Sequence, residues 1–129
     1  MSAFKRFLPF VALALMSQAA SFAADRSAYD QKAFEAAQAS NLPILLDVSA
    51  PWCPTCKAQK PILEKLTADP AYKDLKIFDI DFDSQTDLLR SLRVQKQSTL
   101  IVYKGKTEQG RSTGDTAEAS ISALLHKSL

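Results

Sequence analysis

The sequence has few cysteines, no excess of one charge and no long apolar run beyond its first two dozen residues. Its only two cysteines, Cys53 and Cys56, lie three residues apart, which excludes a scaffold held by several widely spaced disulfides. Apart from Lys5 and Arg6, the 14 acidic residues are matched by as many basic ones, so we expect no nucleic-acid partner. A length of 129 residues suits one soluble domain without a second core.

The first 23 residues differ in composition from the rest. A short basic start precedes an almost unbroken apolar run at residues 7–16, and small residues follow up to Ala23. This layout predicts a secretory signal peptide over residues 1–23, cut after Ala23. A membrane anchor is the alternative, but the run is shorter than the roughly 20 residues that span a bilayer, and it contains Pro9. We therefore expect residues 24–129 to form an exported domain, periplasmic or secreted.

Apolar spacing in residues 24–129 predicts alternating helices and strands. Helices are expected at residues 27–40, at 54–66, shortly after 84 and from 115 onward, and strands at 44–48, 75–81, 99–103 and 107–111. Ser27, Ser84 and the capping box at residues 115–118 are expected to start three of the helices. This order predicts an α/β fold, with a mixed four-stranded sheet flanked by helices on both faces.

The two cysteines follow the apolar strand 44–48 and open the helix in which Pro54 suits the first position. A disulfide that closes so short a loop stabilises a protein by only roughly 2 kcal/mol, so the pair is better suited to reversible redox chemistry. Backbone N–H groups and the helix dipole favour a thiolate on Cys53, which we predict to be the nucleophile. Cys56, one turn later and expected to be less exposed, would resolve the mixed disulfide.

Other side chains leave alternatives open. Asp47 lies in an apolar strand, where a carboxylate is costly unless it is neutralised or hydrogen-bonded; a solvated position at the strand edge is the other interpretation. Trp52 either shields the thiol and supports the turn or is a core aromatic. His126, the single histidine, is expected on the surface near a helix C-terminus.

These features together resemble the thioredoxin superfamily across residues 24–129. The resemblance rests on Trp-Cys-Pro-Thr-Cys-Lys at residues 52–57, on Asp47 before it, on Pro61 in the following helix, and on residues 94–103 and Gly114. It implies a thioredoxin-like fold and a protein disulfide oxidoreductase that needs no organic cofactor or metal, because the dithiol itself carries two electrons. It also implies that Asp47 is a buried proton acceptor that activates Cys56. Substrate contacts are expected from Trp52, Pro54, Thr55, Gln97 and Ser98.

The residues between the cysteines bear on the direction of electron flow. The Pro54-Thr55 pair matches neither the Gly-Pro of thioredoxin nor the Pro-His of strongly oxidising periplasmic relatives. Thr55 carries no positive charge to stabilise a thiolate, which favours a reductant or a moderate exchanger. We expect a monomer that acts on protein thiols and disulfides and exchanges electrons with a membrane-linked donor or acceptor.

Two positions depart from the family. Ser98 stands where relatives have a cis-proline, and we expect the Gln97–Ser98 peptide to be trans, since a cis bond before a non-proline residue costs about 2.5 to 4 kcal/mol. Either Ser98 hydrogen-bonds Cys53, or loss of the proline opens the thiolates to a metal or iron–sulfur cluster, which would need a dimer or exogenous ligands. Asp79 stands where thioredoxin has a lysine near its buried aspartate. These departures leave open a binding or chaperone module without turnover.

Overall fold

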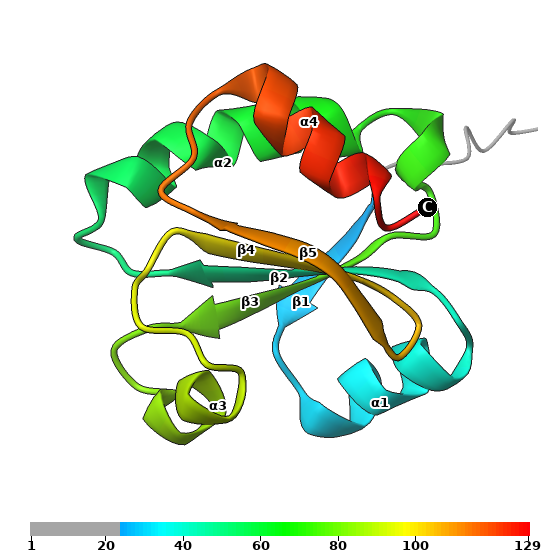
Figure 1. The fold of residues 1–129 in the computed structure, drawn as a ribbon, viewed down its shortest axis with the longest axis horizontal. Helices are drawn as coiled ribbons and strands as arrows, with labels where there is room; N and C mark the ends of the chain where they lie inside the picture. The colour runs from blue at the N-terminus through cyan, green and yellow to red at the C-terminus, as the bar shows by residue number, and fades with distance from the viewer. Residues whose placement is uncertain (1–23) are drawn as a thin grey trace, which may run out of the picture.

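A five-stranded mixed sheet forms the centre of the computed structural model, which describes residues 24–129 (Figure 1). The strands are β1 (Asp25–Ala28), β2 (Pro43–Ser49), β3 (Lys76–Asp81), β4 (Thr99–Lys104) and β5 (Thr107–Thr113), in the spatial order β1-β3-β2-β4-β5. β1 and β2 run parallel to β3 on either side of it, while β4 and β5 are antiparallel to their neighbours. The predicted signal peptide, residues 1–23, lies outside the described residues.

Four helices cover both faces of the sheet. They are α1 (Gln31–Ala39), α2 (Pro54–Thr67), α3 (Thr86–Ser91) and α4 (Glu118–His126), with a 3-10 turn at Pro70–Tyr72. α2 and α4 lie on one face, and α1 and α3 lie on the other (Figure 1). The predicted α/β class and the helices on both faces are confirmed. No helix within residues 24–129 is long and apolar enough to cross a membrane.

The central strand β2 is buried almost throughout, because helices cover both of its faces. Ile44, Leu46 and Val48 pack in the core beneath α1 and α3, whereas Leu45 packs in the core beneath α2 and α4. Successive side chains of a strand point to opposite faces, so Asp47 shares the face of Leu45. The strand therefore carries one carboxylate toward α2, the helix that begins at the cysteines.

The prediction of a four-stranded sheet misses the edge strand β1. Residues 27 and 28 were assigned to the first helix and residues 25 and 26 to no element, but residues 25–28 form a strand whose side chains are exposed and show no apolar alternation. Its attachment comes from backbone hydrogen bonds, such as Tyr29 N–H to the Asp79 carbonyl at 2.9 Å. The helix begins later, with Asp30 as its N-cap, and the Asp30 carboxylate accepts a bond from the backbone N–H of Ala33 at 2.9 Å.

Two other helix starts differ from the predictions by one or two residues. α3 is preceded by Gln85 as its N-cap, and the Ser84 hydroxyl bonds to an aspartate instead. α4 has Ala117 as its N-cap, with no side-chain capping bond. Asp115 still stabilises this start from outside the helix, because its carboxylate accepts bonds from Ala117 N–H and from the Ser120 hydroxyl.

Candidate active site

The turn between β2 and α2 brings the two cysteines together, as predicted. Cys53 is the N-cap residue of α2 and has extended backbone angles, while Cys56 lies in the first helical turn. The two form a disulfide with their Cα atoms 5.3 Å apart. The backbone N–H of Cys56 donates a hydrogen bond to Cys53 Sγ at 3.1 Å. The first sulfur thus occupies the place where a capping oxygen usually accepts the free N–H groups of a helix.

The relative exposure of the cysteines is the reverse of the prediction. In this disulfide-bonded form Cys53 has no exposed surface, whereas Cys56 is half-buried. Cys53 is folded into the turn, because its N–H bonds the Ala50 carbonyl at 3.1 Å and its sulfur accepts the bond from Cys56. Attack by Cys53 on a substrate therefore requires its sulfur to become accessible once the disulfide is reduced.

A cavity of about 350 Å³ connects Cys56 with Asp47. Arg26, Asp79 and two lysines, Lys57 and Lys60, are among the other residues that line it. Asp47 is buried, and it reaches this cavity from β2 on the face covered by α2. A carboxyl group and the Cys56 sulfur thus share one small cavity, which is the arrangement that proton transfer between them needs.

Arg26 holds Asp47 from the neighbouring edge of the sheet. Its Nη1 lies 3.1 Å from Asp47 Oδ2 and also pairs with the carboxylate of Asp79. Burial raises the pKa of Asp47 above its ordinary value; the Arg26 charge and hydrogen bond oppose the rise, and the Asp79 charge adds to it. The expectation that the Asp47 carboxylate is hydrogen-bonded is therefore confirmed, and a solvated strand-edge position is wrong.

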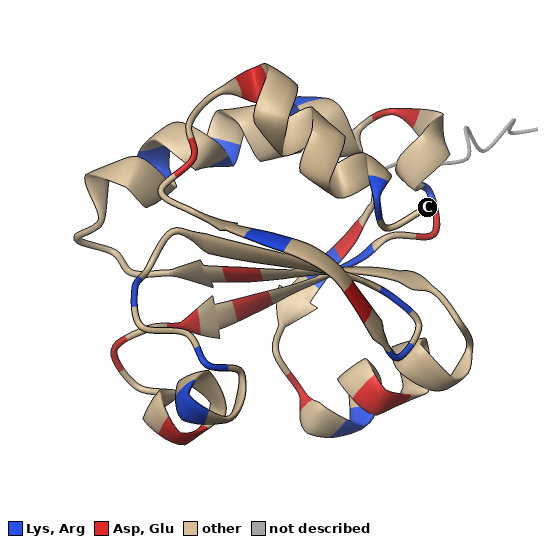
Figure 2. Ribbon diagram, in the orientation of Figure 1, with Lys and Arg blue, Asp and Glu red and all other residues tan. Residues whose placement is uncertain are grey.

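Sequence reasoning did not find Arg26. Asp47 and Asp79 are register partners on β2 and β3, and Arg26 reaches both from β1 on the far side of β3. Acidic residues mark β2 and β3 in Figure 2. The resemblance implies a lysine at the position of Asp79, whereas this chain supplies a cation beside Asp47 from a different strand, as Arg26. Arg26 could be placed beside Asp47 only by assigning residues 25–28 to a strand next to β3. The sequence of these residues shows no apolar alternation that would predict a strand.

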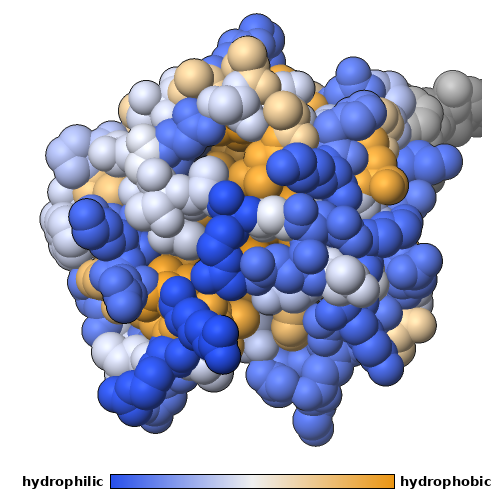
Figure 3. Space-filling view, in the orientation of Figure 1, coloured by the Kyte–Doolittle hydropathy of each residue, from blue (hydrophilic) through white to orange (hydrophobic). Residues whose placement is uncertain are grey.

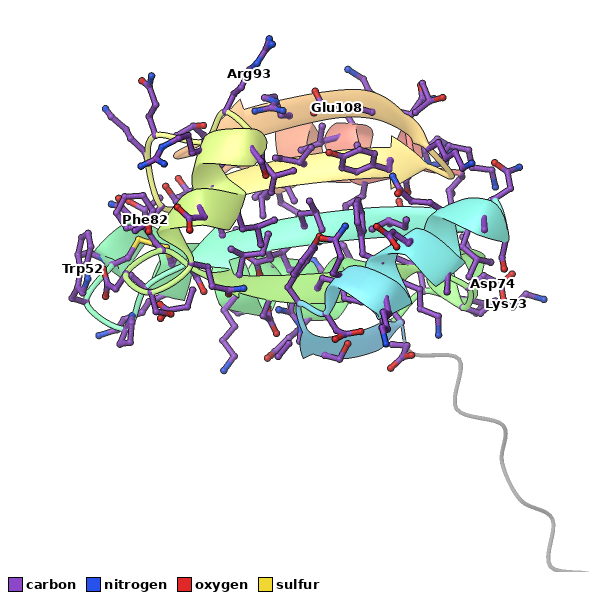
Figure 4. All side chains as sticks on the ribbon, turned by 90° about the horizontal axis from the view of Figure 1, so that it is seen from below. Trp52, Lys73, Asp74, Phe82, Arg93 and Glu108 are labelled. Atoms are coloured by element: carbon purple, nitrogen blue, oxygen red, sulfur yellow. A yellow bond between two sulfur atoms is a disulfide. The ribbon has the colours of Figure 1, made fainter. Side chains whose placement is uncertain are left out.

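Trp52 lies on the surface beside the cysteines. Its side chain is 54% exposed, and its Nε1 donates to both carboxylate oxygens of Asp83, at 2.9 and 3.1 Å. Its ring meets Phe82 edge-on, with centroids 6.4 Å apart (Figure 4). The core-aromatic interpretation is therefore wrong. Trp52 is held by the segment that follows β3 and presents an apolar face next to the disulfide, at a place suited to contact with a substrate.

Ser98 adopts a left-handed backbone conformation, with φ of +59°. The peptide bond before it is trans, as are all the others within residues 24–129. Its N–H donates to the Val48 carbonyl at 2.8 Å, and its carbonyl accepts from the Gly114 N–H at 3.1 Å. Its hydroxyl donates to the carbonyl of Gln97 and not to Cys53, so the expected bond to the sulfur is not formed in the disulfide state.

Gln59 ties this loop to α2, and it too escaped the sequence analysis. Its buried Nε2 donates to the carbonyls of Ser98, at 3.2 Å, and Asp115, at 2.9 Å. The sequence offered one indication of this role, which is that a polar residue stands on the inner face of the helix, six residues after Cys53. Through Gln59, the helix that carries the cysteines is bonded to the loop that contains Ser98.

The remaining predicted residues surround the turn or lie far from it. Pro54 is exposed and Thr55 is half-buried at the start of α2, and Gln97 is half-buried beside Ser98. His126 is exposed in the last turn of α4, as predicted. Within residues 24–129, no three His, Cys, Asp or Glu side chains are grouped in a way that could hold a metal ion.

Comparison with known proteins agrees with this geometry. The family model described as Thioredoxin matches residues 26–127. A thioredoxin of Mycobacterium tuberculosis is 33% identical over 82 residues, which cover 64% of this chain and 70% of the relative. A thioredoxin of Aspergillus fumigatus is 30% identical over 96 residues, or 74% and 84% of the two chains. The crystal structure of Trxlp from Edwardsiella tarda is 44% identical with a TM-score of 0.76, and the match covers 78% of this chain and 98% of that one.

The family match spans nearly all of the described residues, and the redox pair stands where the resemblance implies. A protein of this fold with two cysteines bonded at a helix start transfers electrons by forming and breaking that bond. The chain belongs to the thioredoxin family and is a protein disulfide oxidoreductase.

Proposed function

We propose that this oxidoreductase acts on secreted or periplasmic proteins as a reductant or a moderate exchanger, with Cys53 as nucleophile and Cys56 as resolving thiol. The leader-like composition of residues 1–23 supports export, and the uncharged Thr55 supports the redox assignment. We further propose that the protein works as a monomer and exchanges electrons with a membrane-linked partner, because a reductant in an oxidising compartment must be recharged. The hydrogen bond from Cys56 N–H to Cys53 Sγ is the observation that carries the roles of the two cysteines.

In the reductive direction the reaction has two steps. The Cys53 thiolate attacks one sulfur of the substrate disulfide, a mixed disulfide forms, and the other substrate sulfur leaves as a thiol. The Cys56 thiolate then attacks Cys53 Sγ, which releases the second substrate thiol and forms the Cys53–Cys56 disulfide. Two electrons pass from the dithiol to the substrate. The backbone N–H that meets Cys53 Sγ stabilises negative charge on this sulfur while it is the attacking thiolate of the first step.

Asp47 accepts the proton that Cys56 must lose before the second step. Both residues line one cavity, and burial raises the pKa of Asp47 above its ordinary value, which makes its carboxylate a better proton acceptor. Arg26 holds the carboxylate in place through its 3.1 Å contact. Asp79, which is partly exposed and bound to the same guanidinium, gives the charge network a connection to solvent.

The substrate lies across the residues around the turn. Trp52 offers an exposed ring, and Pro54 and Thr55 are accessible at the start of α2. The Gln97 N–H has no hydrogen-bond partner within residues 24–129, so it is free to pair with the backbone of an extended substrate next to Ser98.

Reduction of a model protein disulfide by the purified dithiol protein tests the proposal. We expect turnover with the native protein, none with Cys53→Ser, and stable mixed disulfides with client proteins when Cys56→Ala traps the first step. Lys106→Gln, an exposed change in the β4–β5 turn at the end of β2 away from both sulfurs, is the control and should retain turnover. If Cys56→Ala leaves Cys53 free in the presence of oxidised clients, the chain is a binding module and the proposal is wrong.

A further inference from the structure

A second cavity, of about 590 Å³, lies beside the active-site turn at the foot of α3. Phe82, Leu89 and Val94 form its apolar floor, and Arg90 and Arg93 stand at its edge. The space-filling view shows an apolar hollow bordered by strongly hydrophilic side chains on this part of the surface (Figure 3). We call it the α3 cavity. Its volume accommodates one large aliphatic or aromatic side chain.

The α3 cavity adjoins the redox pair on two sides. Phe82, part of its floor, packs edge-on against the ring of Trp52, which directly precedes Cys53. Val94, on its other wall, leads within four residues to Ser98, whose N–H is bonded to the end of β2. Trp52 and Phe82 lie at the same end of the molecule as the disulfide in Figure 4. A chain segment with its cysteine at the turn can therefore extend into the cavity.

The edge of the α3 cavity is basic. Arg90 and Arg93 are the charged residues that line the cavity. Asp81 and Asp83, on either side of Phe82, are already hydrogen-bonded to Ser84 and Trp52. The contact of Arg90 with Asp87 is 3.5 Å long and joins side chains that are 81% and 96% exposed, so it restrains Arg90 little. Arg93 forms no ion pair within residues 24–129, and it projects outward in Figure 4. The positive charge on this edge is available to a partner.

Arg93 occupies a position that does not suit an arginine. It follows α3 with a φ of +56°, and the Val94 N–H bonds back to the Leu89 carbonyl at 2.9 Å. Helices usually place glycine at such a left-handed end, because any side chain is strained there. Glycine would end this helix equally well, so the fold gains nothing from the arginine side chain. The strained backbone of Arg93 lies near the active site, which indicates that the arginine side chain serves binding rather than folding.

We propose that the α3 cavity docks substrate segments in which an apolar side chain stands next to acidic residues, a few positions from the reacting cysteine. The apolar side chain fills the space over Phe82, Leu89 and Val94, and the acidic groups meet Arg90 and Arg93. The inference rests on the proposed function and narrows its substrate class. It also means that segments rich in lysine or arginine at the same positions are disfavoured.

Reduction of matched peptide disulfides tests this docking. Two peptides differ only in having Leu-Asp-Glu or Leu-Asn-Gln beside the cysteine. Two exposed ion pairs are worth a factor of about 2 to 30, so we expect kcat/KM to be higher by that factor for the acidic peptide at low ionic strength. The preference should shrink as salt is added, and replacing the peptide leucine by alanine should lower kcat/KM for both peptides. Equal rates for the acidic and neutral peptides would overturn the inference.

Variants of the protein distinguish an effect on peptide docking from an effect on stability and from an effect on the thiol–disulfide exchange itself. Arg93→Gly relieves the backbone strain at the cost of chain entropy, so it should leave stability unchanged or slightly higher while it reduces the acidic preference, a combination that a purely structural arginine cannot produce. Lys106→Glu, a charge change in the β4–β5 turn at the opposite end of β2, is the matched control and should leave the preference unchanged. Reduction of 2-hydroxyethyl disulfide should be the same in all variants. Failure of the native protein on this small disulfide refutes the proposed function, whereas normal activity without a peptide preference refutes only the docking.

Discussion

Replacing Ser98 by the proline that relatives carry should destabilise this protein. Ser98 has a φ of +59°, whereas proline is held near −65°. Proline also lacks the N–H that bonds the Val48 carbonyl at 2.8 Å, and Val48 is fully buried. The loop cannot simply rotate, because the Ser98 carbonyl is held by Gln59 and Gly114. The native conformation of this loop is thus incompatible with the residue that the family favours.

The magnitude follows from these contacts. An unpaired buried carbonyl costs about 1 to 3 kcal/mol, and forcing the backbone out of its native conformation adds roughly 1 kcal/mol more. Ser98→Pro should therefore lower the free energy of unfolding by about 2 to 4 kcal/mol. Ser98→Gly removes a left-handed penalty of roughly 1 to 2 kcal/mol but adds about 0.5 to 1 kcal/mol of chain entropy on unfolding, so it should be neutral or slightly stabilising.

Urea unfolding of the disulfide-bonded protein, followed by Trp52 fluorescence and by circular dichroism, measures these differences. Ser98→Ala keeps the N–H and the strained φ and loses only the hydroxyl bond to Gln97, so it controls for the side chain. We expect stability to fall in the order Gly, Ser, Ala, Pro, with similar slopes against urea. A proline variant as stable as the native protein would refute this reasoning, because it would show that the loop does not depend on the bond to Val48.

Three further predictions concern the buried carboxylate and export. The pKa of Asp47 is raised, so its ionisation disfavours the folded state at neutral pH, and Asp47→Asn should be more stable than the native protein at pH 7. Urea titrations should show this gain shrinking as the pH falls and disappearing below about 3, where the carboxyl is protonated in both the folded and the unfolded state. Arg26→Gln removes the charge that opposes the rise in that pKa, so the pH profile of the Cys56 step, measured by release of a preformed mixed disulfide, should move upward, while an unchanged profile would exclude the pairing. Expression of the full chain in a bacterium should yield an exported protein whose first residue, read by mass spectrometry, is Ala24; an intact leader would contradict the export proposal.

The parts of the fold with strong local patterns were predictable from the sequence. The apolar run in β2 (Pro43–Ser49) indicated a strand buried on both faces, and Pro54 after Cys53 indicated the start of a helix. Both signals come from neighbouring residues, which explains why they placed the redox pair correctly. The edge strand β1 (Asp25–Ala28) was missed because its side chains are exposed and show no apolar alternation. It is joined to β3 by backbone hydrogen bonds and by the ion pairs of Asp25 and Arg26.

The candidate site was predictable only where it is local in sequence. Arg26 contacts Asp47 although 21 positions of sequence and the strand β3 separate them. No sequence pattern around Arg26 or around Asp47 predicts that contact. Ser98 was identified as a departure from the family, but its left-handed backbone follows from hydrogen bonds to Val48 and Gly114, which lie far from it in sequence. The exposure of the two cysteines also depends on tertiary packing, and the sequence order suggested the reverse.

We propose that the start of α2 makes Cys53 the reactive sulfur, although the disulfide form leaves Cys56 the more exposed of the two. Limited alkylation of the freshly reduced protein with iodoacetamide at neutral pH, followed by peptide mapping, shows whether the place at the helix start or the greater exposure sets which thiol reacts first. We expect Cys53 to be modified first, and faster than a cysteine in an unstructured peptide. Modification of Cys56 first, or equal and ordinary rates at both sulfurs, would contradict it.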